Sequence, residues 1–243
     1  SGGSVGGDGG LVEVSSAGEL TFAGTVSAAA MNGMDGTLLL DPKDIRIEPT
    51  GAEVATGQLF NFNPAGLSSI SGAALSAAIN AANVELQANN DIVVADNITA
   101  TTVGNGLTLR AGRAIAVQDD FAISLNGGDF QATINDSNAD LANRDPGDAR
   151  FSMADGSSIT TNGGNIIIEP GNLIGEAGEV SFEGATLNAG DGNIEITGRS
   201  RENGIDVIGV AVGNTRLQTS ENGSINLLGT ASNGTGAGHI GLV

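Results

Sequence analysis

The chain contains 243 residues and carries a formal charge of −19, which comes from 28 acidic residues against nine Lys and Arg. It has no cysteine, which excludes disulfides, thiol catalysis and thiolate metal sites. The strong negative charge makes nucleic acid and anionic lipid poor partners, so we expect neither nucleic-acid binding nor membrane insertion. With 39 glycines and only 3% aromatic residues, the composition predicts an all-β protein with many turns and an aliphatic core.

The segment 1–48 combines a glycine-rich start with short apolar alternations. Strands are predicted in Leu11–Val14 and Leu20–Phe22, and a stronger apolar run follows at Thr37–Leu40. Asp41-Pro42 ends that run because proline cannot donate to a strand ladder, and Ile45–Ile47 resumes it. No basic and apolar signal peptide begins at Ser1, so we expect a mature product or a fragment.

The segment 49–83 breaks this rhythm. From Ile70 to Ala82 the apolar residues recur at a spacing of three or four, which predicts a short amphipathic helix near residues 70–82. Ser69 or Ser71 is the candidate cap at its start, and Asn83 is the candidate residue at its end. A single helix among strands is best explained as an excursion that lies on the flank or protects a sheet edge. A binding role is the alternative.

From Val84 to the end, short strands of alternating apolar residues return, and many follow the same type of turn. These turns are GNG before Leu107, GGD before Phe130, GGN before Ile166, GDGN before Ile194 and NGS before Ile225. Two series are regular: Val84, Leu107 and Phe130 are equally spaced, and Ile166, Val180 and Ile194 are equally spaced at a shorter interval. Strands this short are not stable alone, so they must stack on copies of themselves.

Short strands, loose periods near ~20 residues and Asn or Gly at the corners predict a parallel β-helix, in which each coil forms one rung. We expect a single domain over residues 1–243, with first rungs in 1–48, an excursion with the helix in 49–83 and further rungs in 84–243. About ten rungs at a spacing of ~4.8 Å would give a rod of roughly 50 Å. The alternative fold is a β-sandwich, although its hairpin turns are usually tighter than these.

The segment DGTLLLDPKDIRI, from Asp35 to Ile47, resembles the GtLLLDPxnI signature of filamentous haemagglutinin-like exoproteins, which are large adhesins exported by two-partner secretion. GGDGGLVEVSSAGELTFAGTV before it, and LSAAINAANVELQANNDIVV followed by LTLRAGRAIAV after it, resemble the flanking segments of that family. The resemblance covers about residues 6–135. It implies a right-handed parallel β-helix, export through a partner pore of a Gram-negative bacterium, and work at the cell surface or in the extracellular matrix.

The amino-terminal secretion domain of that family carries an Asn-Pro-Asn motif. The closest segment here, NFNP at residues 61–64, is not a convincing match. The chain therefore resembles a shaft segment or a processed piece of such an adhesin.

Few residues could bind a metal. His239 is the only histidine, so neither a His-based metal cluster nor a catalytic triad can be assembled in one chain. The turns GGDGG and GDGN resemble calcium-binding glycine-aspartate turns, which makes Asp8 and Asp191 the candidate calcium ligands. No other cofactor is expected.

Two other clusters of charged residues are candidates for chemistry or for ion pairing. Asp119 and Asp120 could serve as the paired carboxylates of a glycosidase or lyase. One lysine and the absence of Trp and Tyr argue against a saccharide-processing groove. Arg110 and Arg113 lie in LRAGRA, and we expect them near a rung corner in exposed ion pairs with neighbouring acids.

Three functions remain. The first is a non-enzymatic structural or adhesive shaft, which presents length and surface to a cell-surface or carbohydrate receptor as part of a longer adhesin. The second is a protomer of a self-assembling extracellular fibre, because the open ends of a β-helix expose unpaired backbone groups to further copies, end to end. The third is a β-helical polysaccharide-processing enzyme.

Overall fold

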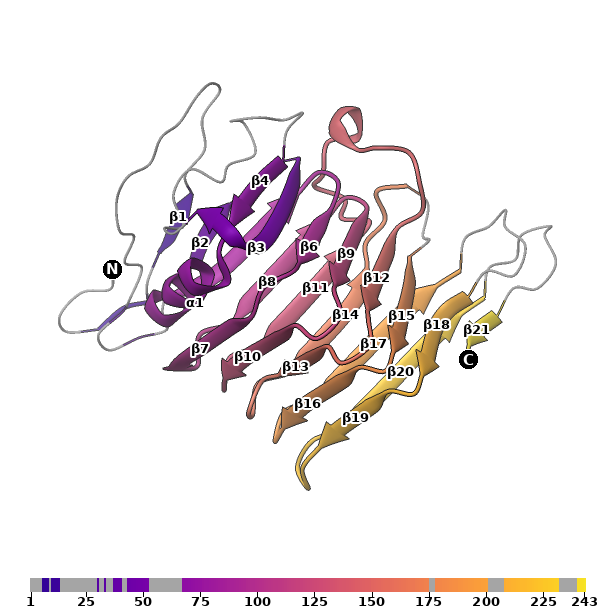
Figure 1. Ribbon diagram of the computed structural model, residues 1–243. Coiled ribbons are helices and arrows are strands. Elements are labelled where there is room, and N and C mark those ends of the chain that lie inside the picture. The colour runs from indigo at the N-terminus through magenta and orange to yellow at the C-terminus, as the bar shows by residue number, and fades with distance from the viewer. Residues whose placement is uncertain are drawn as a thin grey trace.

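The computed structural model describes residues 6–8, 10–13, 30, 33, 37–40, 43–52, 67–174, 178–200, 208–231 and 240–243. In these residues the chain winds into a parallel β-helix, whose three sheets run along one axis from the N-terminal to the C-terminal end (Figure 1). Neighbouring strands of the sheets pair in parallel, for example at Phe130 and Ile166, which confirms the predicted fold class. The β-sandwich alternative is wrong, because the strands of a sandwich pair antiparallel.

From β5 (Asn83–Ala88) to β19 (Arg216–Thr219) the strands follow one another through sheets 1, 2 and 3 in turn, and the strands before and after them extend sheets 1 and 2 only. Sheet 1 consists of β1 (Leu11–Glu13), β2 (Thr37–Leu40), β5 (Asn83–Ala88), β8 (Leu107–Ala111), β11 (Phe130–Ile134), β14 (Ile166–Pro170), β17 (Ile194–Arg199) and β20 (Ile225–Thr230). Sheet 2 consists of β4 (Leu67–Ile70), β3 (Asp44–Ala52), β6 (Ile92–Val94), β9 (Ala114–Val117), β12 (Arg150–Met153), β15 (Glu179–Glu183), β18 (Ile208–Gly213) and β21 (Ile240–Leu242). Sheet 3 consists of β7 (Ile98–Val103), β10 (Ala122–Asn126), β13 (Ser158–Thr160), β16 (Thr186–Gly190) and β19 (Arg216–Thr219).

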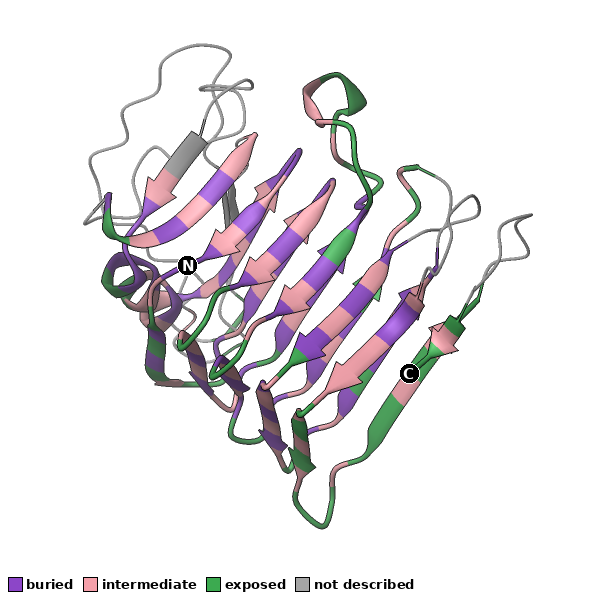
Figure 2. Ribbon diagram, turned by 45° about the vertical axis from the view of Figure 1, so that its right-hand side comes forward, coloured by how far each residue is buried: buried purple, intermediate pink, exposed green. Residues whose placement is uncertain are grey.

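Inward-facing side chains of successive rungs stack in columns. The alternation of apolar residues directs every second side chain inward, and the parallel register places apolar residues above one another. One column of sheet 1 consists of Val84, Leu107, Phe130, Ile166, Ile194 and Ile225. The first five of these are at most 1% exposed, and the same alternation of buried and partly exposed positions runs along the stack (Figure 2). The columns form one aliphatic core.

The repeated glycine turns form the corner at which the chain passes from sheet 3 to sheet 1. Here Gly128, Gly164, Gly192 and Gly223 stack on one another. A Cβ on Gly164 would lie 2.1 Å from the carbonyl oxygen of Gly128, and one on Gly192 would lie 2.1 Å from that of Gly164. Only glycine lets the backbones of successive rungs approach this closely, which explains why GGD, GGN and GDGN recur before the sheet-1 strands.

A ladder of side-chain oxygens lies beside this glycine column. The backbone N–H of Asn165 donates to Asp129 Oδ1 at 2.7 Å, and that of Asn193 donates to Asn165 Oδ1 at 2.9 Å. Ser224 continues the ladder, since its N–H donates to Asn193 Oδ1 at 2.9 Å. The Asp or Asn after each glycine therefore joins one rung to the next.

The glycine column provides a stability prediction. We expect Gly192→Ala to lower the free energy of unfolding by about 1–3 kcal/mol, because the new methyl group overlaps backbone that has no room to move. Urea denaturation followed by circular dichroism measures this loss. Gly10→Ala is the matched control, since a Cβ there meets no atom within 4 Å. Equal stability of the two variants would contradict the stacked corner.

The predicted helix is present as α1 (Gly72–Ala81). Ser71, one of the two candidate caps, is its N-cap and accepts a hydrogen bond from the N–H of Ala74 at 3.1 Å. The expectation that Asn83 ends the helix is wrong. The C-cap is Ala82 in an extended conformation, because Asn83 already begins β5 and pairs with Thr37.

Helix α1 protects the N-terminal edge of sheet 3, where it lies against β7. The Asn80 side chain accepts hydrogen bonds from the N–H groups of Thr101 and Thr102 at 2.7 and 2.9 Å, and Ser76 accepts one from Thr99 at 2.8 Å. The adjacent face of the helix covers the end of the core with Leu75 and Ile79, both 0% exposed. The interpretation of this excursion as an edge protector is therefore confirmed.

The rungs are longer and fewer than predicted. Val84, Leu107 and Phe130 are one rung apart as expected, but the shorter interval from Ile166 to Val180 is not a rung, because Val180 lies in sheet 2. Ile166 and Ile194 are themselves neighbours in sheet 1. In the described residues sheet 1 contains eight strands instead of about ten rungs, which corresponds to roughly 35 Å of stack. Among those residues, no helix has the length and apolar character needed to cross a membrane.

Candidate functional site: a clamped loop at one corner

A loop of residues 135–149 projects from the corner between sheets 1 and 2. It connects β11 to β12 and contains a short 3-10 helix, η1 (Leu141–Asn143), at the top of the projection in Figure 1. At its tip the side chain of Leu141 is 54% exposed. We call this segment the corner loop.

Asp145 is the centre of the contacts that fasten the corner loop. Its Oδ1 pairs with the Nζ of Lys43 at 2.9 Å, and its Oδ2 accepts a hydrogen bond from Asn90 Nδ2 at 3.1 Å. The backbone N–H of Asp145 donates to Asn90 Oδ1 at 3.1 Å. Lys43 and Asn90 belong to two earlier rungs, so the loop is held back against the stack.

Two guanidinium groups hold the backbone of the same loop. Arg144 Nη1 donates to the carbonyl oxygen of Asp145 at 3.0 Å, and its Nη2 donates to that of Gly147 at 2.8 Å. Arg113 Nη1 donates to the carbonyl oxygen of Pro146 at 3.1 Å. Three successive carbonyls of the loop therefore each accept a charged donor.

Further contacts anchor these arginines and the rest of the loop on the corners below. Arg144 Nε donates to the carbonyl of Gly112 at 2.7 Å, and Arg113 forms a two-point ion pair with Asp91. Asn89 Oδ1, fully buried, accepts a hydrogen bond from the N–H of Asp140 at 2.6 Å. The corner loop is therefore fastened to the stack at Asp140, Arg144 and Asp145, while Leu141 remains exposed.

The charges of the corner reinforce this clamp. The hydrogen bond from Lys43 holds the pKa of Asp145 below its usual range, and the bond to Asp145 in turn raises the pKa of Lys43. Burial, with the nearby Arg113, lowers the pKa of Arg144. The ionised Asp145 therefore stabilises the clamp at neutral pH, and this stabilisation is lost as the pH falls through its lowered pKa. The charged Lys43 stabilises the clamp until the pH rises through its raised pKa.

Removing the lysine should loosen the loop without unfolding the stack. We expect Lys43→Met to speed amide hydrogen exchange in residues 138–148 several-fold, because the Asp145 carboxylate loses its charged partner. Arg46→Met is the matched control, since Arg46 pairs with Glu48 on its own strand, at 2.7 Å, instead of with the loop. A wild-type exchange pattern in Lys43→Met would show that the ion pair does not hold the loop.

The candidate calcium ligands do not come together. Asp8 is exposed near Gly33 at the N-terminal end, whereas Asp191 lies at a glycine corner between β16 and β17, where it accepts a hydrogen bond from Ser220. In the part of the chain that the structure describes, no group of three or more His, Cys, Asp or Glu side chains is placed to hold a metal. His239 lies outside that part.

The other charged candidates occupy structural positions. Arg110 pairs with Glu85 at 2.8 Å and with Asp136 at 3.1 Å, and Arg113 pairs with Asp91, so the predicted ion pairs near a corner are confirmed. These side chains are half-buried, not exposed as predicted, because the loop and neighbouring strands cover their stems. Asp119 and Asp120 lie in an exposed turn.

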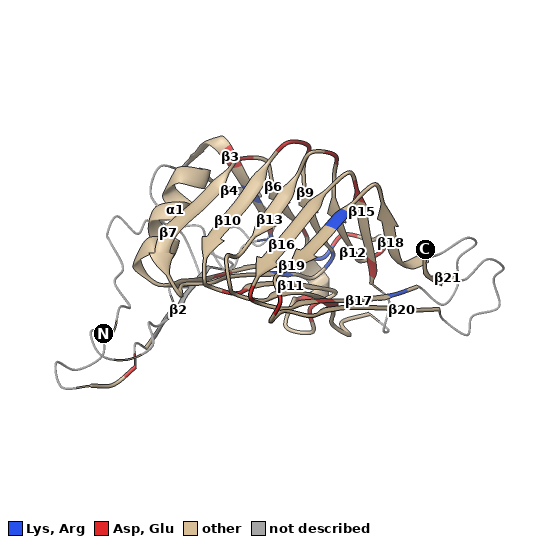
Figure 3. Cartoon of the chain, turned by 90° about the horizontal axis from the view of Figure 1, so that it is seen from below, with Lys and Arg blue, Asp and Glu red and all other residues tan. Residues whose placement is uncertain are grey.

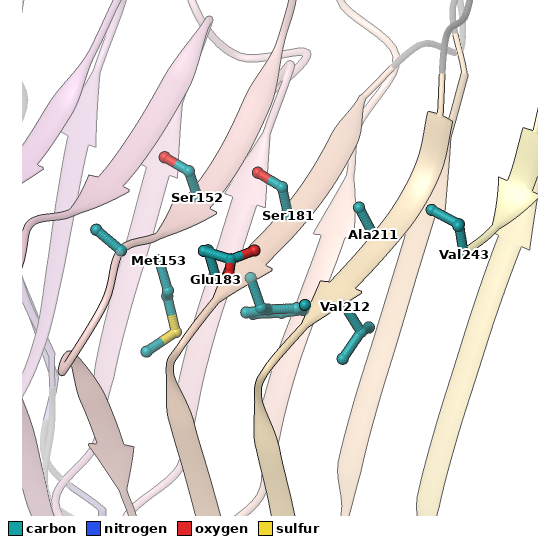
Figure 4. A pocket seen from close by; sticks show the side chains of 10 residues that line it. Ser152, Met153, Ser181, Glu183, Ala211, Val212 and Val243 are labelled. Carbon is teal, nitrogen blue, oxygen red and sulfur yellow. The ribbon is translucent and has the colours of Figure 1, made fainter.

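A hollow of roughly 440 Å³ lies on sheet 2, where β12, β15 and β18 run side by side. Ser152, Ser181 and Ala211 point to one side of these strands, and Met153 and Val212 point to the other (Figure 4). Among the described residues, Glu183 is the one acidic side chain that lines it.

The C-terminal rung, formed by β19, β20 and β21, leaves its inward positions uncovered. Ile225 is 42% exposed and Leu242 is 50% exposed, whereas their neighbours one rung earlier, Ile194 and Val210, are fully buried. The change is visible where the strands at the end of the stack turn from purple to green (Figure 2). This end of the core is open, in contrast to the edge that α1 covers.

No family model, no curated protein and no solved structure matches the chain.

Of the clamp residues, Arg113 was expected near a corner in an ion pair, and the other contacts were not predicted from the sequence. An indirect signal of the loop is the interval from Phe130 to Ile166, which is longer than the preceding rung, from Leu107 to Phe130.

Proposed function

We propose that this chain is a structural and adhesive segment of a secreted, filamentous haemagglutinin-like exoprotein, working outside the cell or at its surface. The observation that carries the proposal is the continuous stack of apolar columns, which extends a rigid body along one axis instead of enclosing a pocket. The three segments that resemble the family would then lie in consecutive rungs. The exposed inward residues at the C-terminal rung support a shaft, because another rung stacked on them would bury them.

The outer surface of sheet 3 suits contact with a neutral partner. Its outward side chains over three strands are uncharged, and all but Ala122 are polar: Ala122, Ser124, Ser158, Thr160, Thr186 and Asn188. Acidic side chains gather instead in the turns and along other edges (Figure 3). A flat face of hydroxyl and amide groups offers hydrogen bonds to an uncharged carbohydrate receptor without charge repulsion.

A fibre of head-to-tail copies is the second candidate, and one observation weighs against it. Helix α1 occupies the N-terminal edge of sheet 3, so β19 of one copy finds no free strand edge there on the next. Only sheets 1 and 2 are left for pairing between copies. We therefore place the shaft ahead of the fibre.

Secretion and microscopy test the proposal together. The chain is fused behind the secretion domain of a haemagglutinin-like exoprotein and co-expressed with the partner pore, and we expect it to reach the cell surface as folded β-rich protein. Retention in the periplasm, with the secretion domain alone exported normally, would contradict the proposal. Negative-stain electron microscopy over a concentration series, with and without calcium, should show short rods, and long filaments would favour the fibre.

A further inference from the structure

The bond between Asp145 and Pro146 lies inside the clamp of the corner loop. Asp-Pro is the most acid-labile peptide linkage, since the neighbouring carboxylate can attack the carbonyl and the prolyl nitrogen is a good leaving group. The chain contains one other such bond, Asp41-Pro42, which lies outside the described residues. The structure therefore describes the surroundings of the Asp145–Pro146 bond.

The carbonyl group of this bond is activated as an electrophile. Arg144 Nη1 donates to the carbonyl oxygen of Asp145 at 3.0 Å, where negative charge would develop during attack at the carbonyl carbon. The guanidinium is fixed by its other bonds to Gly112 and Gly147. On the far side of the bond, Arg113 holds the carbonyl of Pro146. The peptide is thus oriented on both sides and polarised at its centre.

The attacking group lies beside the bond, and solvent can reach it. The Asp145 carboxylate stays ionised beside Lys43, and rotation about its side chain brings an oxygen to its own carbonyl carbon through a five-membered ring. Oδ2 is held only by the 3.1 Å hydrogen bond from Asn90, so it is the oxygen more readily released. Pro146 is exposed and the Asp145 side chain is 48% exposed, which gives solvent access to the bond.

We propose that the folded chain cleaves its own Asp145–Pro146 bond. The Oδ2 of Asp145 forms a bond to the Asp145 carbonyl carbon, and the carbon–nitrogen bond to Pro146 breaks as that nitrogen takes a proton from solvent. The product is a cyclic anhydride on Asp145. Water then adds to the anhydride, which leaves the α- and β-carboxylates of Asp145 and the free secondary amine of Pro146. The net reaction consumes one water molecule and no other reactant.

The two fragments would remain associated. The fragment 1–145 includes β11, and the fragment 146–243 includes β14, which pairs with β11 from Phe130 with Ile166 to Ile134 with Pro170. Strand β9 pairs with β12 in the same way across the cut. Cleavage would therefore nick the corner loop and free its exposed tip without dividing the β-helix.

Intact mass spectrometry of the purified full chain, incubated at neutral pH, tests this proposal. We expect denatured samples to yield two fragments, residues 1–145 and 146–243, whose summed mass exceeds that of the chain by one water. Asp145→Ala should abolish the product, because the variant has no side-chain group that can attack the carbonyl. Arg144→Gln should slow it about tenfold, because it removes the charged donor to the carbonyl oxygen.

Three comparisons separate self-cleavage from a purely structural clamp. A synthetic peptide of residues 138–150 gives the intrinsic rate of the bond, and we expect the folded chain to exceed it at least tenfold. Asp41→Asn is the matched control and should cleave like the wild type. Thermal melting establishes that each variant is folded. A folded-chain rate no higher than that of the peptide would overturn the proposal and leave the clamp a structural device.

Discussion

Ile166→Asp should unfold the middle of the stack. Ile166 is fully buried between Phe130 and Ile194 in a column of sheet 1, so the variant places an unpaired carboxylate among aliphatic side chains. The carboxylate must either stay charged without a partner or take up a proton, and both cost free energy. We expect a loss of about 3–5 kcal/mol or complete failure to fold.

Ile167→Asp is the control for this variant, because the next residue along β14 points outward and is only partly buried. A carboxylate there meets water, so we expect a change within about 1 kcal/mol. Chemical denaturation followed by far-ultraviolet circular dichroism measures both variants. Equal melting of Ile166→Asp and Ile167→Asp would show that the inward face of sheet 1 has been assigned incorrectly.

Leu75→Asp should detach α1 from the end of the core. Leu75 is 0% exposed and lies on the helix face that covers the first rungs, so its replacement by a charge favours undocking of the helix. Undocking also removes Asn80 and Ser76 from the edge of β7, which leaves backbone N–H groups without their acceptors. We expect a loss of about 3–5 kcal/mol together with association through the uncovered edge.

Hydrogen exchange identifies the cause of that loss. In Leu75→Asp the amides of residues 99–102 should lose protection before those of the central rungs, because their acceptors lie on the helix. Ala77→Asp, on the exposed side of the same helix, is the control and should leave this protection unchanged. Uniform loss of protection over all rungs would contradict a capping role for α1.

The sequence was informative wherever the structure depends on local pattern. Alternating apolar residues identified the inward columns. The glycine turns identified one corner, because the backbones of successive rungs lie too close together there for a Cβ. The spacing of apolar residues from Ile70 to Ala82 identified α1. The predicted end of the helix was one residue late. Asn83 belongs to β5 because it pairs with Thr37 of β2, and the helix sequence carries no signal of that contact.

The clamp and the number of rungs depend on contacts between distant residues, which leave little local signal. Lys43 and Asp145 are 102 positions apart, and neither stands in a recognisable motif for pairing. Val180 was grouped with Ile166 and Ile194 because a strand of sheet 2 has the same apolar alternation as one of sheet 1. Insertions such as the corner loop change the rung length, so period alone does not assign strands to sheets.

The register of successive rungs defines the parallel β-helix, and the absence of cysteine allows a direct measurement of it. Ser158 on β13 and Thr186 on β16 are register partners on the outside of sheet 3, whereas Arg216 on β19 lies one rung further along. Neighbouring parallel strands bring Cα atoms within disulfide range, and strands two apart lie beyond it. Mild oxidation followed by peptide mass spectrometry should therefore give a disulfide in Ser158→Cys/Thr186→Cys and none within one chain of Ser158→Cys/Arg216→Cys. The reverse result, or no bond in either variant, would contradict the parallel β-helix.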